Sequence, residues 1–516
     1  MRRPAMPSSP HRSRTPLHLS LIMATSLLAW APSLFGYFLS DDFNVVTLLN
    51  RNRTAVDWPN VLSDFYTVYR GDLTYSYYRP MITLSGGIDL SLWGFTAAGP
   101  HLTNMILNAL NGGLVYGIAA RPPISSPAVG LTAALLFALH PLHPEAVYWL
   151  VGRTELIMAC FALLAILLYL VYTDRNGRLP YLGSLLSFAL ALGSKETAVV
   201  VPVALTWYHL MLRHSGRTRP ALPPAASLLP YYLLLGAYFG LRKALTGHVI
   251  GQYGPMGVNP SDPFLMSLGL GRLFLCLLFP AGSLLTPAGD AVIGDTARRL
   301  LGLIPWLSAA VVAVIAMAGS RRRTVPFCLG LTVIFAMPVL SVLAVWGSPD
   351  LFSRLYYLPS AAFCLLVGVL LDNSRGPVRR YGTPILLLAS ASLLAVNSLP
   401  WIQAGRIART ILAQIGQTAD EPGARAVLVI GNPDFHFGAE LFGEEGWALP
   451  IAAAPPFVTV PPSVRILHHP GNPCAPLRDG LIQRDDKTVI LAWDRAAQRL
   501  TPLTWDRLTT DCSTGR

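Results

Sequence analysis

The sequence predicts an all-α, multi-span membrane protein that ends in a small water-soluble domain. Of the 516 residues, 53% are hydrophobic and only 13% are charged, whereas soluble domains carry about 25% charged residues. Long apolar runs fill the first 400 residues, and short β-rich segments follow them. The formal net charge of +12 comes with arginines in short loops between apolar runs. Arginines in such loops orient membrane helices, so the charge does not indicate a nucleic-acid partner.

The apolar runs are rich in Leu, Ala and Val, as expected of helices that satisfy their own backbone hydrogen bonds in lipid. They cover residues 18–39, 100–120, 126–150, 154–172, 180–194, 197–212, 225–245, 264–285, 301–320, 324–345, 355–372 and 381–400. The first run follows a basic tail, residues 1–17. It continues past the length of a signal-peptide core, so we predict an uncleaved first span.

Basic clusters mark the helix ends that we expect to face the cytoplasm. They are Arg121, Arg175 with Arg178, Arg213 with Arg217 and Arg219, Arg321-Arg322-Arg323, and Arg375 with Arg379 and Arg380. With the N-terminus also inside, these clusters alternate correctly only if 264–285 does not cross the membrane. That segment carries Arg272 near its middle and ends in Pro280-Ala281-Gly282. We therefore predict about eleven transmembrane helices, a re-entrant or interfacial helix at 264–285, and an extracytoplasmic C-terminus.

The chain divides into a cytoplasmic tail (1–17), a transmembrane domain (18–400) and a soluble domain (401–516). The outer loop 40–99 is rich in tyrosine, which favours the membrane–water interface. The soluble domain is predicted to be α/β or mainly β, with strands at 427–430, 457–460 and 488–492. Its two cysteines, Cys474 and Cys512, can form a disulfide in an oxidising compartment.

Two adjacent carboxylates, Asp41 and Asp42, follow the first span directly. Charges at the edge of a membrane span are costly and often functional. Two neighbouring carboxylates also repel each other, which raises the proton affinity of one of them. The pair is therefore a candidate general base for a hydroxyl at the membrane surface, the alternative being a solvated helix stop.

A second cluster combines two histidines with a glutamate, His140, His143 and Glu145. The intervening prolines exclude the regular helix on which a His-Glu-x-x-His zinc site is built. Three interpretations stay open: hydrogen bonding to a sugar or phosphate, binding of a divalent metal, and a structural helix cap.

Cationic side chains at predicted outer ends form a third group of candidates. Lys195 is followed by Glu196, which suggests either a self-neutralised turn or a lysine that contacts a lipid phosphate. Arg354 with Tyr356-Tyr357, together with Arg79, suggests either interfacial anchors or ligands of an anionic head group. Arg153 lies in Gly152-Arg153-Thr154-Glu155, which follows the His140–Glu145 cluster.

Several polar motifs occur together in order between residues 15 and 400. They are Ser40-Asp41-Asp42-Phe43, Tyr78-Arg79-Pro80, Asp89, His101-Leu102-Thr103-Asn104, residues 139–147, Gly152-Arg153, Ser194-Lys195-Glu196-Thr197, Tyr357-Leu358-Pro359-Ser360 and Phe363-Cys364. This set resembles the membrane glycosyltransferases of the GT-C fold, and more narrowly the transmembrane and tetratricopeptide-repeat O-mannosyltransferases. Members of that family often continue into tetratricopeptide repeats, whereas the last part of this chain has no internal repeat. The departure leaves the acceptor open.

The resemblance implies an enzyme that transfers a sugar, with inversion, from a polyprenyl-phosphate carrier to an acceptor hydroxyl of a protein or glycan. It assigns the base to Asp41 or Asp42, and it implies that cations such as Arg79, Arg153, Lys195 and Arg354 stabilise the departing lipid phosphate. Enzymes of this kind need no metal, so we expect no cofactor. The expected location is a bacterial cytoplasmic (inner) membrane, with the active site on its outer face.

Two other functional classes share a basic, aromatic outer face. A transporter or flippase for a lipid-linked saccharide would carry ionisable residues at mid-membrane and inverted repeats with broken helices, whereas the charges here cluster at the ends of spans. A glycan ligase or polymerase of another fold would use a lipid-linked oligosaccharide rather than a lipid-linked monosaccharide. A non-enzymatic assembly subunit would tolerate loss of the acidic pair.

Overall fold

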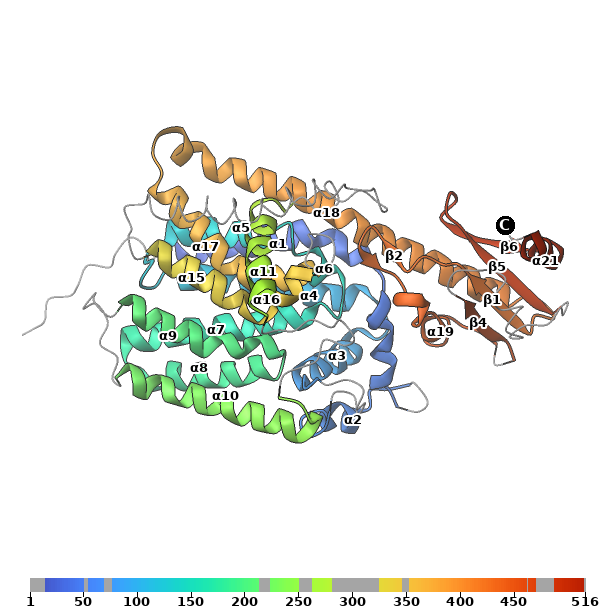
Figure 1. The fold of residues 1–516 in the computed structure, drawn as a ribbon, viewed down its shortest axis with the longest axis horizontal. Helices are drawn as coiled ribbons and strands as arrows, with labels where there is room; N and C mark the ends of the chain where they lie inside the picture. Colours follow the sequence, from blue (N-terminus) through green and yellow to red (C-terminus); the bar gives the residue numbers. More distant parts are fainter. Residues whose placement is uncertain are drawn as a thin grey trace, which may run out of the picture.

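The computed structural model describes residues 14–50, 54–68, 77–212, 223–249, 262–280, 324–345, 352–461, 463–469 and 487–514. A bundle of long helices forms most of the molecule, and a small domain of strands and helices lies at one end of it (Figure 1). Within these ranges six helices are long and apolar enough to cross a membrane. The protein is therefore a multi-pass integral membrane protein with a strand-containing C-terminal domain, which confirms the predicted fold class.

The first helix, α1 (Thr15–Trp30), passes into a 3-10 turn, η2 (Ala31–Phe35). The chain then runs extended to Leu39 and begins a second 3-10 helix, η3 (Ser40–Leu48), which carries the acidic pair. The tyrosine-rich segment that follows contains two helices, α2 (Trp58–Ser63) and the apolar α3 (Pro80–Trp93). The predicted loop 40–99 therefore contributes packed structure to the outer end of the bundle.

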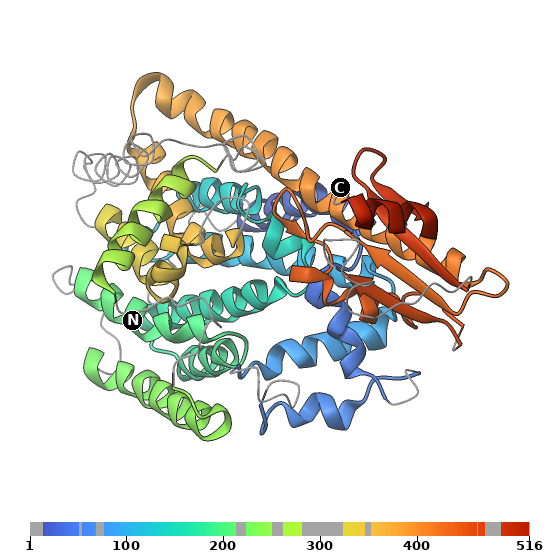
Figure 2. The same ribbon diagram turned by 45° about the vertical axis from the view of Figure 1, so that its right-hand side comes forward.

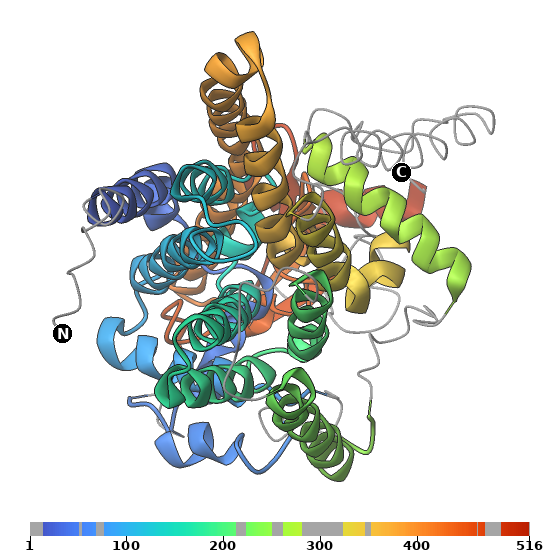
Figure 3. The ribbon, with the colours of Figure 1, turned by 90° about the vertical axis from the view of Figure 1, so that its left-hand side faces the viewer.

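The central helices are α4 (Ala98–Ala119), α5 (Pro127–Ala138), α7 (Arg153–Arg175), α8 (Arg178–Leu192) and α9 (Val200–Leu212), with the turn η5 (Glu196–Val199) before α9. Helix α10 (Pro224–Thr246) lies outside α8 and α9, as the end-on view shows (Figure 3). The single run predicted at 126–150 is wrong. Prolines at 141 and 144 end the span at Ala138, and the short α6 (Pro144–Tyr148) follows.

The last membrane helices include α11 (Pro263–Leu278), α15 (Thr324–Ala336), η7 (Met337–Val339), α16 (Leu340–Val345), η8 (Ser353–Tyr356) and α17 (Tyr357–Asn373). Helix α11 has 16 residues, which span about 24 Å at ~1.5 Å per residue and fall short of a ~30 Å hydrocarbon layer. Whether 264–285 crosses the membrane stays a prediction. The predicted span 301–320 lies outside the described residues.

Helix α18 (Gly376–Ala419) is 44 residues long and joins the membrane part to the C-terminal domain (Figure 2). Its first half exposes Ile385 and Leu388, as a helix that faces lipid does. Its second half buries Ile411 and Ile415 and contacts strands of the C-terminal domain. The helix continues through Pro400, so a single helix passes from the membrane part to the soluble domain.

The C-terminal domain is α/β. Its sheet has the order β4-β1-β5-β6, formed by β4 (Arg465–His469), β1 (Ala426–Ile430), β5 (Thr488–Asp494) and β6 (Arg499–Leu503). The first three strands are parallel and β6 is antiparallel to β5. The small hairpin β2 (Phe435–His436) and β3 (Ala439–Glu440), the turn η9 (Glu444–Gly446), α19 (Leu449–Ala452) and α21 (Trp505–Thr514) complete it.

The strand predicted at 457–460 is wrong, because this segment forms a turn and a bend and pairs with no strand in the part of the chain that the structure describes. The ring of Phe457 instead packs against Phe38, Phe43 and Phe95, at centroid distances of 5.2, 5.0 and 6.3 Å. An alternating apolar pattern therefore serves here to dock the domain on the membrane part. The predicted Cys474–Cys512 disulfide is not tested, because Cys474 and the side chain of Cys512 lie outside the described structure.

The two ends of the bundle differ in charge. At one end Arg121 forms an ion pair with Asp174, with 2.8 Å between Nη1 and Oδ2, so the basic clusters after α4 and α7 lie together. The connection from α17 to α18 lies at the far end from the C-terminal domain (Figure 1). These basic segments therefore lie away from the C-terminal domain, and the predicted orientation, in which basic loops face the cytoplasm, stays a prediction.

We predict that alkaline phosphatase fused after Arg516 is active and that a fluorescent protein at the same position is dark, because the positive-inside rule puts the C-terminal domain outside. Fusions after Asn373, at the basic end, are the matched control and should give the reverse pattern. Fluorescence at Arg516 would refute this orientation.

Candidate functional site

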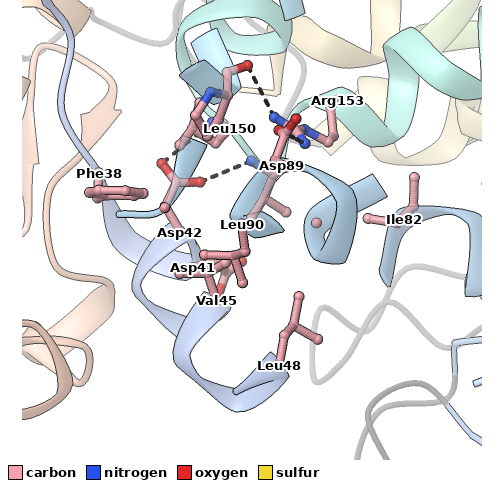
Figure 4. A pocket seen from close by; sticks show the side chains of 14 residues that line it. Phe38, Asp41, Asp42, Val45, Leu48, Ile82, Asp89, Leu90, Leu150 and Arg153 are labelled. Carbon is pink, nitrogen blue, oxygen red and sulfur yellow. Dashed lines mark hydrogen bonds and ion pairs between the residues drawn. The ribbon is translucent and has the colours of Figure 1, made fainter. Parts of the chain in front are cut away.

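The acidic pair lies in η3, and its second member is held by backbone N–H groups. The carboxylate of Asp42 accepts hydrogen bonds from Leu39 N at 3.0 Å, Val151 N at 2.9 Å and Leu150 N at 3.4 Å. Two of these donors come from the loop before α7, about 110 residues away in the sequence. Asp42 therefore clasps η3 to the start of α7 (Figure 4).

Two opposing effects act on the proton of Asp42. Burial in a nearly water-free site raises the pKa of its carboxyl to about 8, and the charge of Asp41 acts in the same direction. The three backbone N–H donors favour the carboxylate and lower the pKa, but less than burial raises it. Asp42 is only 3% exposed, and its carboxyl is held by the backbone at the edge of a pocket.

A pocket opens between η3, α3 and the start of α7. Its empty space is about 580 Å³, counting the part open to solvent. Its walls are mostly apolar, and its polar groups are carboxylates and one arginine (Figure 4). The lining residues are Phe38, Asp41, Asp42, Val45, Leu48, Ile82, Gly86, Asp89, Leu90, Gly94, Pro100, Leu150, Val151 and Arg153.

The cation of this pocket is Arg153, the first residue of α7. Its guanidinium forms a buried ion pair with Asp89 of α3. It also donates to Ser85 Oγ at 3.2 Å and to Pro100 O at 3.1 Å. The pairing lowers the cost of burying the guanidinium, and it holds the guanidinium in the wall that also contains the acidic pair.

The other predicted cations also have acidic partners. Arg79 holds Glu196 with two hydrogen bonds, of 2.7 and 3.2 Å. Lys195 bonds to Glu155 of α7, so Lys195 and Glu196 form their hydrogen-bonded ion pairs with different partners. The alternative, in which Lys195 contacts a lipid phosphate, stays a prediction. Glu145 accepts from Arg354 N at 2.8 Å, from the Arg354 guanidinium and from Ser353 Oγ at 3.2 Å.

These pairs act on one another electrostatically. The charges of Arg79 and Arg354 both influence Lys195, and Asp41 influences Tyr77, whose ring lies 4.1 Å from the Arg79 guanidinium carbon. The structure therefore gathers the predicted carboxylates and cations at one end of the bundle, although they come from segments far apart in the sequence.

His140, His143 and Tyr357 form a network in the interior. The two imidazoles stack with centroids 4.9 Å apart, and His143 Nε2 hydrogen-bonds Ser360 Oγ at 2.8 Å. Tyr357 donates to Asn108 Oδ1 at 2.8 Å. None of the three lines the pocket that contains Asp41 and Arg153, so their predicted contact with substrate remains a prediction and their observed contacts are with the protein.

A second hollow lies on the other side of η3. It is lined by Ser40, Asp41, Glu440, Glu445 and Trp447, and we call it the polar recess. Its last three residues belong to the C-terminal domain and were missed by the sequence reasoning. No spacing links them to η3, which lies about 400 residues earlier, so only the fold could reveal them.

The helical bundle and this charged pocket define a class: a multi-pass membrane protein with an acidic and basic site at one end of its bundle. Residues 80–235 match the family model described as dolichyl-phosphate-mannose-protein mannosyltransferase. The chain is also similar to Protein O-mannosyl-transferase F38B6.6 of Caenorhabditis elegans, with 23% identity over 70% of this chain and 52% of that protein. It is 32% identical to Protein O-mannosyl-transferase TMTC1 of Mus musculus, over 29% of this chain and 16% of that protein.

Among solved structures, ArnT from Cupriavidus metallidurans bound to undecaprenyl phosphate aligns with a TM-score of 0.43 and 15% identity, over 92% of this chain and 93% of that one. The Archaeoglobus fulgidus oligosaccharyltransferase aligns with a TM-score of 0.42 and 12% identity, over 89% and 65%. This chain spans at most about half the length of the O-mannosyl-transferases named above. The sequence matches confirm the predicted resemblance to protein O-mannosyl-transferases.

We predict that the melting temperature of the detergent-solubilised protein falls as the pH rises through about 8, and that Asp42→Asn weakens this dependence. The folded-state pKa of Asp42, about 8, lies above its ordinary value of 3.8. Protonation of Asp42 therefore stabilises the fold fully below the unfolded pKa, and this stabilisation is lost as pH rises through the folded pKa.

The matched control is Glu421→Gln, an exposed carboxyl at the end of α18, which should keep the wild-type slope. An unchanged slope in Asp42→Asn would contradict the assignment.

Proposed function

We propose that the protein is a glycosyltransferase that moves a sugar from a polyprenyl-phosphate carrier to an acceptor hydroxyl on the extracytoplasmic face of the membrane. Asp41 is the general base. The observation that carries this proposal is the position of Asp41, on the wall of a largely apolar pocket that also contains the Arg153–Asp89 pair. The resemblance to O-mannosyl-transferases supplies the reaction class.

The pocket suits the donor in two ways. Its apolar wall, made by residues such as Val45, Leu48 and Leu90, fits the first units of a prenyl chain that enters from lipid. Its polar end, with Arg153, fits the phosphate that joins lipid and sugar. Arginine holds phosphate oxygens with paired N–H groups.

In the proposed reaction, Asp41 takes the proton of the acceptor hydroxyl as its oxygen bonds to the anomeric carbon of the sugar. The bond between that carbon and the phosphate oxygen breaks, and attack from the opposite face inverts the anomeric configuration. The polyprenyl phosphate leaves with one more negative charge. Arg153, with Arg79, Lys195 and Arg354 nearby, stabilises this charge, which exists only as the bond breaks.

The two aspartates have different roles in this proposal. Asp42 is buried, and its carboxylate accepts hydrogen bonds from three backbone N–H groups. Asp41 is half-buried and lines both cavities. The base is therefore Asp41, and Asp42 is the positioning residue that orients it.

We predict that Asp41→Asn lowers sugar transfer by about 10²-fold or more, because an amide does not accept the proton. The measurement is transfer of label from a radiolabelled polyprenyl-phosphate sugar to membrane glycan or protein. The melting temperature should remain near that of wild type. Asp57→Asn is the matched control, since Asn also serves as the N-cap residue of α2. Full turnover by Asp41→Asn would overturn the base assignment.

We predict that Arg153→Gln lowers kcat by about 10²- to 10³-fold, the loss typical of removing one group that stabilises transition-state charge. The single variant also leaves Asp89 buried without its partner, which destabilises the fold. The double variant Arg153→Gln with Asp89→Asn restores stability and does not restore transfer. If the double variant recovers activity as well, Arg153 has only a structural role.

A further inference from the structure

The C-terminal domain is docked firmly against the segment that carries the proposed base. Ser40 N donates to Leu441 O at 2.7 Å, and the rings of Phe43 and Phe442 stack at 5.8 Å. Phe457 packs against Phe43 from another direction, at 5.0 Å. These contacts lie beside the polar recess and fix the relative position of its two walls.

The two cavities have opposite characters and share one residue. The pocket on the α3 side is mostly apolar, whereas the recess on the C-terminal side is lined by a serine, three carboxylates and an indole. Asp41 lines both. A transfer from a lipid carrier needs this division, because the donor arrives with an apolar tail and the acceptor presents a hydroxyl to the base.

We propose that the polar recess is the acceptor subsite of the proposed transferase and that it takes a neutral sugar unit of a glycan. The proposal rests on the proposed function and names its acceptor class. The C-terminal domain thereby supplies substrate-binding residues, chiefly Glu440 and Trp447.

The residues of the recess match the surface of a sugar. A pyranose presents hydroxyl groups around its rim and C–H groups on its faces, so it binds carboxylate acceptors at the rim and an aromatic ring on one face. Trp447 is 41% exposed and offers an indole surface with one N–H donor. Glu440 and Glu445 offer acceptors for hydroxyl protons.

The charge of the recess selects against anionic acceptors. Asp41, Glu440 and Glu445 line it together, and like charges repel at short range. Glu440 faces Asp41 and the Ser40 hydroxyl, with Arg354 and Glu145 also within electrostatic reach. Burial and the Asp41 charge raise the pKa of Glu440 to about 7, and its bond from Ser40 opposes this rise. Near neutral pH, Glu440 can therefore accept a hydrogen bond from a sugar hydroxyl as a carboxylate, or donate one to it when protonated.

The test measures transfer from a radiolabelled polyprenyl-phosphate sugar to p-nitrophenyl glycosides of mannose and glucose. Trp447→Ala and Glu440→Gln should each raise the KM for the glycoside about tenfold, which corresponds to about 1.4 kcal/mol of binding. The KM for the polyprenyl-phosphate donor should stay unchanged, whereas a general loss of folding would change both KM values. Trp447→Tyr and Glu440→Asp should recover part of the loss.

Phe437→Ala and Glu421→Gln are matched controls, an exposed aromatic and an exposed carboxyl of the same region, and both should behave as wild type. Equal KM values in the recess variants and in these controls would overturn the proposal. Efficient transfer to Ser/Thr peptides, at the same rate in wild type and in the recess variants, would overturn the proposal as well. It would favour a protein acceptor that binds elsewhere.

A binding measurement separates this proposal from the proposed function. Methyl mannoside and methyl glucoside are titrated into the full-length protein, and the fluorescence change of wild type is compared with that of Trp447→Phe. A saturable change that requires Trp447 supports a sugar subsite even if no donor is turned over, in which case only the transferase assignment fails. No change in wild type overturns the subsite, whatever the transferase assay gives.

Discussion

The buried carboxylate of Asp42 is the constraint on which the geometry of the site depends. Its three backbone hydrogen bonds join η3 to the loop that starts α7, and Trp149 Nε1 of that loop donates back to Leu39 O at 3.3 Å. Because Asp41 precedes Asp42 in the same 3-10 helix, fixing one residue fixes the direction of the other. Arg153 follows the same loop, so the hydrogen bonds of Asp42 also set the distance between the proposed base and the cation.

Ion pairs extend this constraint to the rest of the bundle end. Arg153–Asp89 joins α7 to α3, Lys195–Glu155 joins the α8–η5 turn to α7, and Arg354–Glu145 joins η8 to α6. An isolated charge at such depth is very costly, whereas a paired one is tolerated. The partners come from distant segments, so the pairs hold the helices in one arrangement and keep positive charge close to the pocket.

Hydropathy was sufficient to locate helices that face lipid or the bundle core, and α4, α7, α8 and α10 begin and end within a few residues of their predictions. It failed at residues 139–150 because a protein-buried loop is as apolar as a span: Leu142, Ala146 and Val147 are all fully buried. The alternating apolar pattern around Phe457 also predicted a strand that the structure does not form. Local pattern does not distinguish a side chain that packs across a domain interface from one that alternates along a sheet.

The acidic pair and its cations could be predicted because each adjoins a recognisable span end, but their partners could not. Lys195 is adjacent to Glu196 and yet bonds to Glu155, a choice that depends on how α7 and α8 pack. The proximity of Glu440 to Asp41 could be predicted even less. It arises only because α18 places the C-terminal domain over η3.

The placement of the C-terminal domain over η3 links movement of the domain to the geometry of the site. A displacement of the domain would move Leu441 and, through the bond to Ser40 N, the residue next to the proposed base. Occupation of the proposed acceptor subsite and the geometry of the proposed base are therefore coupled through this hydrogen bond and through the stacking of Phe43 on Phe442.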